Sequence, residues 1–263
     1  MFSILFCLLS QSKIYPTPQA RVELVPSTIG MSAGQTVQVA VHLEMPPAWH
    51  SFFINPGETG KPIKVQWKLP PGFKAGAIQW PAPSRKVVGR LASYVYEKEV
   101  WLVSNITTSP QAWDSRTLLS IKATVSWQLC RDHCFDQHAT VELPAVYSLN
   151  PYNNLSFYKA RRTLPIPLEG VVVHAQSGVN AVLLELPLAR IEVNQIEFFP
   201  GDSGNFGAAP SRVRTKGAGI EVEIPFSSRV QTVPKRLKGL LVISSPLGNK
   251  KRSHWIDLPV TKS

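Results

Sequence analysis

Short runs in which apolar and polar residues alternate, separated by proline and glycine, constrain the fold of this chain more than any other feature. Alternation with a period of two places every second side chain on the same face of a β-strand. The chain also contains 23 prolines and 16 glycines, which interrupt helices and favour turns. The pattern predicts an all-β fold that begins with an immunoglobulin-like β-sandwich over residues 16–148. The predicted strands of this domain cover residues 21–25, 36–43, 64–69, 95–104, 118–127 and 139–143.

A second series of strand patterns begins near residue 171, after a segment of different composition. Residues 149–168 are predicted to be a linker with one short helix over 155–162. Residues 169–263 are predicted to form a second, smaller β-sandwich domain. This part holds no cysteine and no recognisable catalytic cluster, so we expect a structural or partner-binding module. Its predicted strands cover residues 171–174, 181–186, 192–199, 219–225, 239–244 and 255–260.

The N-terminus begins with an apolar run that is typical of the hydrophobic part of an export signal. The run is shorter than the roughly 20 residues that cross a bilayer, and no positive residues precede it. We interpret residues 1–15 as the remnant of an export signal; the alternative is a buried first strand. Cleavage would remove Cys7 and leave Cys130 and Cys134 in an oxidising compartment. No transmembrane segment is expected in the mature chain.

The formal net charge of +11 indicates a basic surface, but the sequence holds no basic tail or stripe. Nucleic-acid binding needs a clustered patch with interleaved aromatic residues, so the sequence argues against this class. A solvated basic surface that favours docking to acidic partners is the interpretation that we adopt. The sequence also lacks a glycine-rich loop before a helix and the elbow of a serine hydrolase, so neither nucleotide binding nor that catalysis is predicted.

Cys130 and Cys134 are separated by three residues and lie between two predicted strands, so we expect them in a hairpin. A disulfide that closes so small a ring restricts the unfolded chain little, by about 2 kcal/mol in the chain-entropy model. A bridge that serves stability more often joins distant strands, as in antibody domains. The spacing therefore favours a redox couple that opens and closes. Such a couple needs no cofactor, because the sulfurs carry the electrons.

Two alternatives stay open for this pair. The first is an inert disulfide in a non-catalytic binding module. The second is a copper or zinc site, because Cys130, His133, Cys134 and His138 offer thiolate and imidazole ligands close together. The spacing of the cysteines differs from the two-residue spacing usual in zinc fingers.

Several ionisable residues lie near the pair in sequence. Arg131 and His133 favour a thiolate, whereas Asp132 opposes it, so these three residues are candidates for tuning the thiol pKa. Further upstream, His50 follows a Pro-Pro-Ala-Trp segment, where a buried and partnered histidine is favoured over a general base.

A series of short motifs resembles the N-terminal periplasmic domain of the DsbD family of thiol:disulfide interchange proteins. The resemblance is closest to the branch that includes the copper-sensitivity suppressor ScsB. It covers residues 18–148, and the later domain resembles the second β-domain of ScsB-like members more loosely. The order and spacing of the motifs carry the resemblance. They are Trp49-His50, Asn55-Pro56-Gly57-Glu58-Thr59-Gly60, Trp67-Lys68-Leu69-Pro70-Pro71-Gly72, Ile78-Gln79-Trp80-Pro81-Ala82-Pro83, Tyr94-Val95-Tyr96-Glu97, and Val125-Ser126-Trp127-Gln128-Leu129-Cys130 followed by Cys134.

The resemblance implies a periplasmic protein, soluble or peripherally associated with the inner membrane, whose cysteine pair relays electrons. It implies two kinds of partner: a membrane-linked reductant and thioredoxin-fold clients such as disulfide isomerases. By the same resemblance Cys134 forms the mixed disulfide with a partner and Cys130 resolves it. The sequence given holds neither the transmembrane region nor the thioredoxin-like domain of the family, so its electron source is not encoded here.

The resemblance also implies a cap loop over the cysteines, at residues 85–90. Where some family members have aromatic residues, this chain has Val87 and Val88, so we expect a smaller apolar cap. Basic residues of the cap would add positive charge beside the thiols. The candidates for the cap or for partner docking are Arg85, Lys86, Val87, Val88, Gly89, Arg90, Tyr94 and Tyr96.

Overall fold

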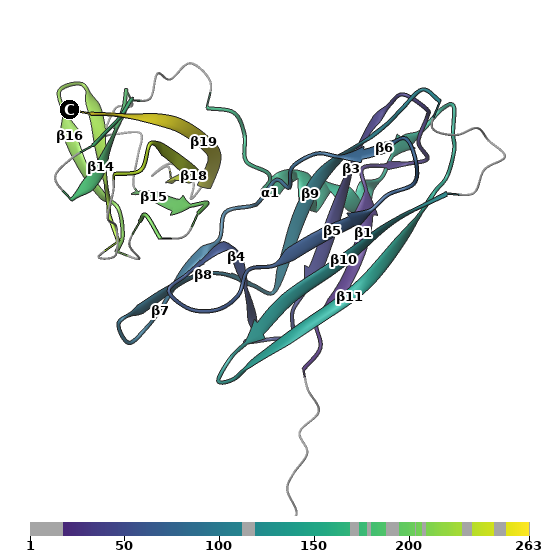
Figure 1. The fold of residues 1–263 in the computed structure, drawn as a ribbon, viewed down its shortest axis with the longest axis horizontal. Coiled ribbons are helices and arrows are strands. Elements are labelled where there is room, and N and C mark those ends of the chain that lie inside the picture. The colour runs from purple at the N-terminus through teal and green to yellow at the C-terminus, as the bar shows by residue number, and fades with distance from the viewer. Residues whose placement is uncertain are drawn as a thin grey trace, which may run out of the picture.

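The computed structural model describes residues 18–111, 119–168, 174–177, 180–187, 195–202, 204–206, 209–227, 233–244 and 251–262. Within these residues the elements are β-strands, apart from one 3-10 turn and one short α-helix (Figure 1). The all-β class predicted from the alternating pattern is therefore confirmed. No helix in this part of the chain is long and apolar enough to cross a membrane.

Two antiparallel sheets pack face to face in the N-terminal part and form what we call the N-terminal sandwich. The four-stranded sheet has the order β1 (Arg21–Pro26), β3 (Thr36–Glu44), β9 (Glu99–Thr108) and β6 (Phe73–Ala75). The six-stranded sheet has the order β11 (Cys134–Ala145), β10 (Leu119–Cys130), β4 (His50–Gly57), β8 (Leu91–Glu97) and β7 (Ser84–Val88), and β5 (Lys64–Lys68) also pairs with β10. A small separate pair joins β2 (Thr28–Ile29) to β12 (Tyr152–Asn153).

The core of the sandwich follows the predicted alternation. Along β10, every second side chain from Ile121 to Leu129 is buried, while the residues between them are only partly covered. Those from Ala123 to Leu129 meet Trp80, Tyr94 and Tyr96 in one apolar cluster. Burial of large aromatic side chains is the main favourable contribution to the stability of such a core.

Two local differences from the expected strands have a clear physical origin. Residues 54–60 carry turn-forming residues, yet the chain is strand from His50 to Gly57 and the turn comes only after it. The register shifts between Phe52 and Gly57, and such a bulge accommodates Pro56, which has no N–H for the ladder. The expected strand over 95–104 is two strands, because Lys98 adopts a left-handed conformation (φ 68°) and turns the chain from β8 into β9.

The segment expected to be a linker packs on the N-terminal sandwich. It contains the 3-10 turn η1 (Leu155–Phe157) and the helix α1 (Tyr158–Thr163), close to the predicted helix over 155–162. Phe157 and Ala160 are buried against Trp101 and Val103 of β9. The domain boundaries stay predictions, but this contact ties part of the connecting segment to the first sheet.

The C-terminal part forms a seven-stranded sheet, which we call the C-terminal sheet. One apolar cluster joins side chains from strands far apart in the sheet, such as Val222 of β17 and Phe198 of β15. The described strands form one continuous path, and the second β-sandwich stays a prediction. Residues 171–173 and 192–194 of two predicted strands lie outside the described residues. The order is β15 (Gln195–Pro200), β18 (Arg236–Ser244), β19 (Lys251–Lys262), β13 (His174–Ser177), β14 (Ala181–Leu186), β17 (Gly219–Pro225) and β16 (Arg212–Lys216), with β13 and β19 parallel.

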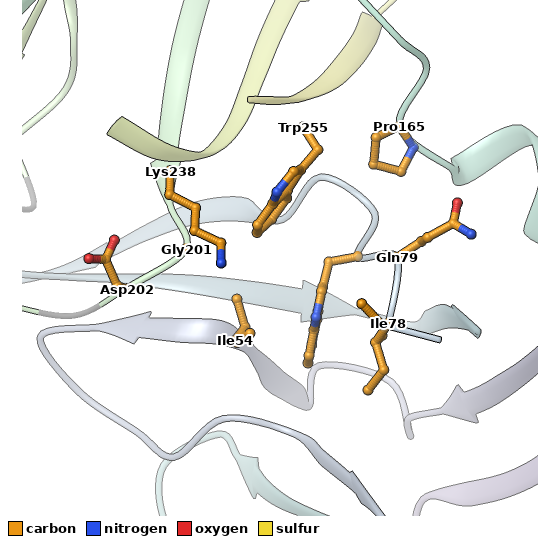
Figure 2. A pocket seen from close by; sticks show the side chains of 10 residues that line it. Ile54, Ile78, Gln79, Pro165, Gly201, Asp202, Lys238 and Trp255 are labelled. Carbon is orange, nitrogen blue, oxygen red and sulfur yellow. The ribbon is translucent and has the colours of Figure 1, made fainter. Parts of the chain in front are cut away.

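The C-terminal sheet contacts the N-terminal sandwich through strands β7 and β8. Arg85 Nε donates a hydrogen bond to Glu197 Oε1 at 3.1 Å, and the ring of Tyr94 meets that of Phe199 edge-on at 5.3 Å. Beside these contacts lies a cavity of about 530 Å³, across which Trp255 of the C-terminal sheet faces Ile54 of β4 (Figure 2). Charged and aromatic contacts thus fix one face of the β7–β8 hairpin to the second part of the chain.

Candidate redox site

The two cysteines close the tip of the β10–β11 hairpin. Cys130 is the last residue of β10 and Cys134 is the first of β11, and the two are Cα partners in the antiparallel register. Their sulfurs are bonded at 2.01 Å, with the Cα atoms 4.1 Å apart. The hairpin position predicted from the flanking strand patterns is confirmed.

The two ends of the disulfide lie in different environments. Cys130 is 2% exposed and packs with Phe52 of β4 and Val95 of β8, whereas Cys134 is exposed at the hairpin tip. A thiol that approaches from solvent therefore meets the Cys134 side of the bond. Thiol–disulfide exchange depends on which sulfur can be reached, and the two cysteines differ in this accessibility.

The turn between the cysteines carries all three candidates for tuning the thiol pKa. Arg131, Asp132 and His133 are exposed. Arg131 Nε donates to Asp132 Oδ2 at 2.8 Å, and its guanidinium lies 5.2 Å from the ring centroid of Trp49. The positively charged guanidinium of Arg131 therefore interacts with a carboxylate and with an aromatic ring. The tuning role of these residues stays a prediction.

A second ionisable group lies on the other side of the disulfide. His50 of β4 is the Cα partner of Cys130 on one side and of Glu97 on the other. Lys86 of β7 brings its Nζ to 3.5 Å from His50 Nδ1 and 3.1 Å from Glu97 Oε1. Burial lowers the pKa of His50, the Lys86 charge lowers it further, and Glu97 acts in the opposite direction. As the sequence predicts, His50 is a buried histidine with a partner.

The candidates for the cap divide between two faces of the β7–β8 hairpin, because side chains alternate along a strand. Lys86 contacts His50, which is paired with Cys130. Arg85 and Tyr94 instead contact the C-terminal sheet. Tyr96 points into the core and donates to the carbonyl of Pro81 at 2.8 Å; burial raises the pKa of this phenol well above its usual value.

The tip of the β7–β8 hairpin is exposed. Val87 and Val88 have 61% and 69% of their surface accessible, and Gly89 and Arg90 make the turn that follows them. Cys130 pairs with His50 of β4, and His50 pairs with Glu97 of β8. Glu97 is about six residues from the hairpin tip, which corresponds to about 20 Å of extended strand. Shielding of the cysteines by Val87 and Val88 stays a prediction, and in this structure the apolar neighbours of Cys130 are Phe52 and Val95.

The loop that carries Gly60 covers Phe52, one of these neighbours. The Cβ that a side chain at Gly60 would carry falls 2.3 Å from the ring of Phe52, and Gly60 has a left-handed φ of 89°. Glu58 holds the same loop to β8 by accepting from the N–H of Ala92 at 2.8 Å. Glycine is therefore required at this position for close approach as well as for conformation. The Asn-Pro-Gly-Glu-Thr-Gly motif was the signal in the sequence.

The described residues contain no group of three or more His, Cys, Asp or Glu side chains placed to hold a metal ion. His138 pairs with Ser126, four residues along β11 from Cys134, which corresponds to about 13 Å in an extended strand. A single ion cannot bridge that separation. The set of Cys130, His133, Cys134 and His138 is therefore not brought together in this structure.

Comparison with known proteins identifies the sandwich. Residues 19–145 match the family model described as thiol:disulfide interchange protein DsbD, N-terminal. This part of the chain is a DsbD N-terminal domain. The resemblance expected over residues 18–148 is thus confirmed, and the Cys130–Cys134 disulfide belongs to a thiol–disulfide interchange domain. No curated protein matches the sequence.

Among solved structures, the chain is similar to the N-terminal periplasmic domain of ScsB from Proteus mirabilis. The identity is 16% and the TM-score 0.62, over 91% of this chain and 92% of that one, so the likeness concerns the fold. A second match is the major pilin subunit BcpA of Bacillus cereus, with 9% identity and a TM-score of 0.30 over 93% of this chain and 68% of the pilin. The ScsB match extends beyond the DsbD N-terminal domain into the C-terminal sheet.

Proposed function

We propose that this protein relays reducing equivalents through Cys130 and Cys134 to thioredoxin-fold partners in the periplasm. The observation that carries the proposal is the asymmetry of the disulfide: Cys134 is exposed at a hairpin tip, and Cys130 is buried beside it. Membership of residues 19–145 in the DsbD N-terminal family supports the chemistry. The likeness to a domain of ScsB described as periplasmic supports the compartment.

The exchange proceeds in two substitution steps at sulfur. In the reduced domain, the Cys134 thiolate attacks the disulfide of the partner, forms a mixed disulfide and releases one partner thiolate. The Cys130 thiolate then attacks the Cys134 sulfur, which closes the intramolecular disulfide and releases the second partner sulfur. Two electrons pass to the partner, and its thiolates take up protons from water. A membrane-linked reductant returns the domain to its dithiol form.

Covalent trapping in the native envelope tests this assignment. With Cys130→Ala, the resolving sulfur is absent, so Cys134 should accumulate mixed disulfides with thioredoxin-fold proteins that a reductant releases. The matched control is Cys134→Ala, in which the remaining sulfur is buried and should trap little or nothing. Comparable trapping by the two variants, or none by Cys130→Ala, would contradict the proposal.

The reduction potential separates an active couple from an inert bridge. Structural disulfides in exported proteins typically have potentials below about −300 mV. We expect equilibration with a glutathione or dithiothreitol buffer to give a less negative value for Cys130–Cys134. A potential below that range would instead support an inert disulfide in a binding module.

A further inference from the structure

The Cys130 sulfur needs a polar partner once the disulfide opens. The residue is 2% exposed and lies against the apolar side chains of Phe52 and Val95. Burial among apolar groups favours the neutral thiol and raises its pKa. Resolution of a mixed disulfide nevertheless requires the thiolate. A group that stabilises negative charge on this sulfur would therefore set the rate of the second step.

His50 occupies the adjoining position in the sheet. It is the Cα partner of Cys130, and directly paired residues in an antiparallel sheet project their side chains from the same face. Its ring meets Phe52 edge-on at 5.4 Å between centroids, and Phe52 packs with Cys130 in turn. His50 is 8% exposed, so its imidazole shares the poorly hydrated environment of the sulfur.

Lys86 determines which ring nitrogen of His50 carries the hydrogen. An ammonium group has donors and no acceptor, so its contact with Nδ1 at 3.5 Å requires a lone pair on that atom. The remaining nitrogen, Nε2, then bears the hydrogen. Because β4 lies between β10 and β8, Lys86 and Glu97 occupy one side of His50 and Cys130 the other. Burial and the Lys86 charge lower the pKa of His50, which keeps the ring neutral near neutral pH.

We propose that the Nε2–H of His50 donates a hydrogen bond to the Cys130 sulfur after the disulfide opens, and stabilises the thiolate that resolves the mixed disulfide. This inference rests on the proposed function and assigns a residue to its second step. The Cys130 thiol first loses its proton to water. The thiolate then bonds to the Cys134 sulfur, the bond from Cys134 to the partner breaks, and the partner leaves as a thiolate.

Other polar groups around the disulfide act less directly on this sulfur. Gln128 Oε1 lies 3.7 Å from Cys130 Sγ and can accept from the reduced thiol, which favours the protonated form. Further charged side chains belong to the turn and to β11. Arg131 is paired with Asp132, and Asp136 is held by Lys61 and Gln128. His133 lies in the exposed turn. His50 is thus the donor that the register places beside Cys130.

Stopped-flow reaction of the reduced protein with 5,5′-dithiobis(2-nitrobenzoate) resolves the two sulfurs. Attack by the exposed Cys134 releases one coloured thiolate at a rate that depends on reagent concentration. Attack by Cys130 on the resulting mixed disulfide releases a second, at a rate independent of that concentration. The rate of the second phase as a function of pH reports ionisation of Cys130.

We expect His50→Phe to slow the second phase about tenfold at neutral pH for each unit by which the thiol pKa rises. The difference in second-phase rate between His50→Phe and the wild type should decrease as the pH approaches the thiol pKa of the variant. The rate of the first phase should be unchanged. His50→Gln keeps an N–H donor and should restore part of the rate. The control is His138→Gln, which changes an exposed histidine four residues along β11 from Cys134 and should leave both phases as in the wild type.

Lys86→Met is a second variant, at a side chain that is only partly buried. It removes the group that orients the imidazole and should slow the second phase several-fold at neutral pH. The rates of the variant and the wild type should again converge at high pH. An unchanged second phase in His50→Phe, or an equal loss at every pH, would overturn the role of His50. Absence of a second phase in the wild type would instead overturn the proposed relay.

Discussion

At the scale of single residues, two buried histidines of the N-terminal sandwich have opposite surroundings. His42 bonds to Glu23 at 3.0 Å and Glu99 at 2.9 Å, and its ring is stacked on Trp101. The hydrogen bond from His42 is the largest factor that lowers the pKa of Glu23. His50 instead has the ammonium of Lys86 beside it. His42 therefore lies between two carboxylates, whereas His50 lies beside a cation.

The second site predicts a loss of stability in weak acid. The pKa of His50 in the folded state lies below the ordinary value of 6.5, so the unfolded chain binds a proton first as the pH falls. The urea midpoint of the oxidised protein should decrease between about pH 7 and about pH 5, and it should decrease less in His50→Phe. The lowered pKa of Glu23 stabilises the folded state above pH 4.5, the ordinary pKa of this group. That contribution to stability is lost only as the pH falls below 4.5. Parallel curves for the wild type and His50→Phe would contradict this account.

At the scale of elements, we expect the β10–β11 hairpin to keep its shape when the disulfide opens. Each strand has 12 residues, and the pairing is continuous from Leu119–Ala145 to Cys130–Cys134. The inner face of β10 is anchored in the core by Trp127 and Leu129. Opening the bond should therefore free only the three-residue turn, as the proposed redox cycle requires.

Reduction should cost the sandwich no more than about 2 kcal/mol of unfolding free energy, because the closed ring is so small. Urea denaturation of the oxidised and reduced protein measures this difference. The Cys130→Ala, Cys134→Ala double variant should match the reduced wild type, apart from a small packing loss at the buried position. Cooperative unfolding on reduction alone would show that the bond is a structural staple.

At the scale of the whole molecule, one hairpin contacts both the redox site and the C-terminal sheet. Lys86 of β7 approaches His50, while its neighbour Arg85 is bonded to Glu197 of β15. The side chains of Arg85 and Glu197 are 12% and 23% exposed, so this ion pair is largely removed from water. Losing one partner of such a pair leaves an unpaired charge in a poorly solvated site.

Glu197→Gln should therefore destabilise the molecule by roughly 1–3 kcal/mol and loosen the two parts of the chain. Calorimetry should show a lower Tm and a transition that broadens or separates into two. Glu142→Gln is the matched control, because Lys122 and Glu142 form a pair on the sandwich surface and exposed pairs contribute roughly 0–1 kcal/mol. Equal effects of the two variants would argue against a contribution of the Arg85–Glu197 pair to the interface.

Much of the fold could be predicted because its signals are local. Ala181–Leu186 and Gly219–Pro225 are strands with the predicted ends, since alternation and flanking turn residues define them. His50–Gly57 was missed because a central strand buried on both faces does not alternate, and its proline sits at a bulge. The hairpin position of Cys130 could be predicted from the sequence. Its apolar neighbours Phe52 and Val95 could not be predicted, because they come from two other strands.

The sequence by itself determined the all-β class, the hairpin and the closely spaced cysteines at its tip, because these depend on residues near one another along the chain. Only the tertiary structure decided that Cys130 is buried and Cys134 exposed, that His50 lies beside the buried sulfur, and that Arg85 faces the C-terminal sheet. Burial and pairing arise from strands distant in sequence. No local pattern encodes which of them will be neighbours.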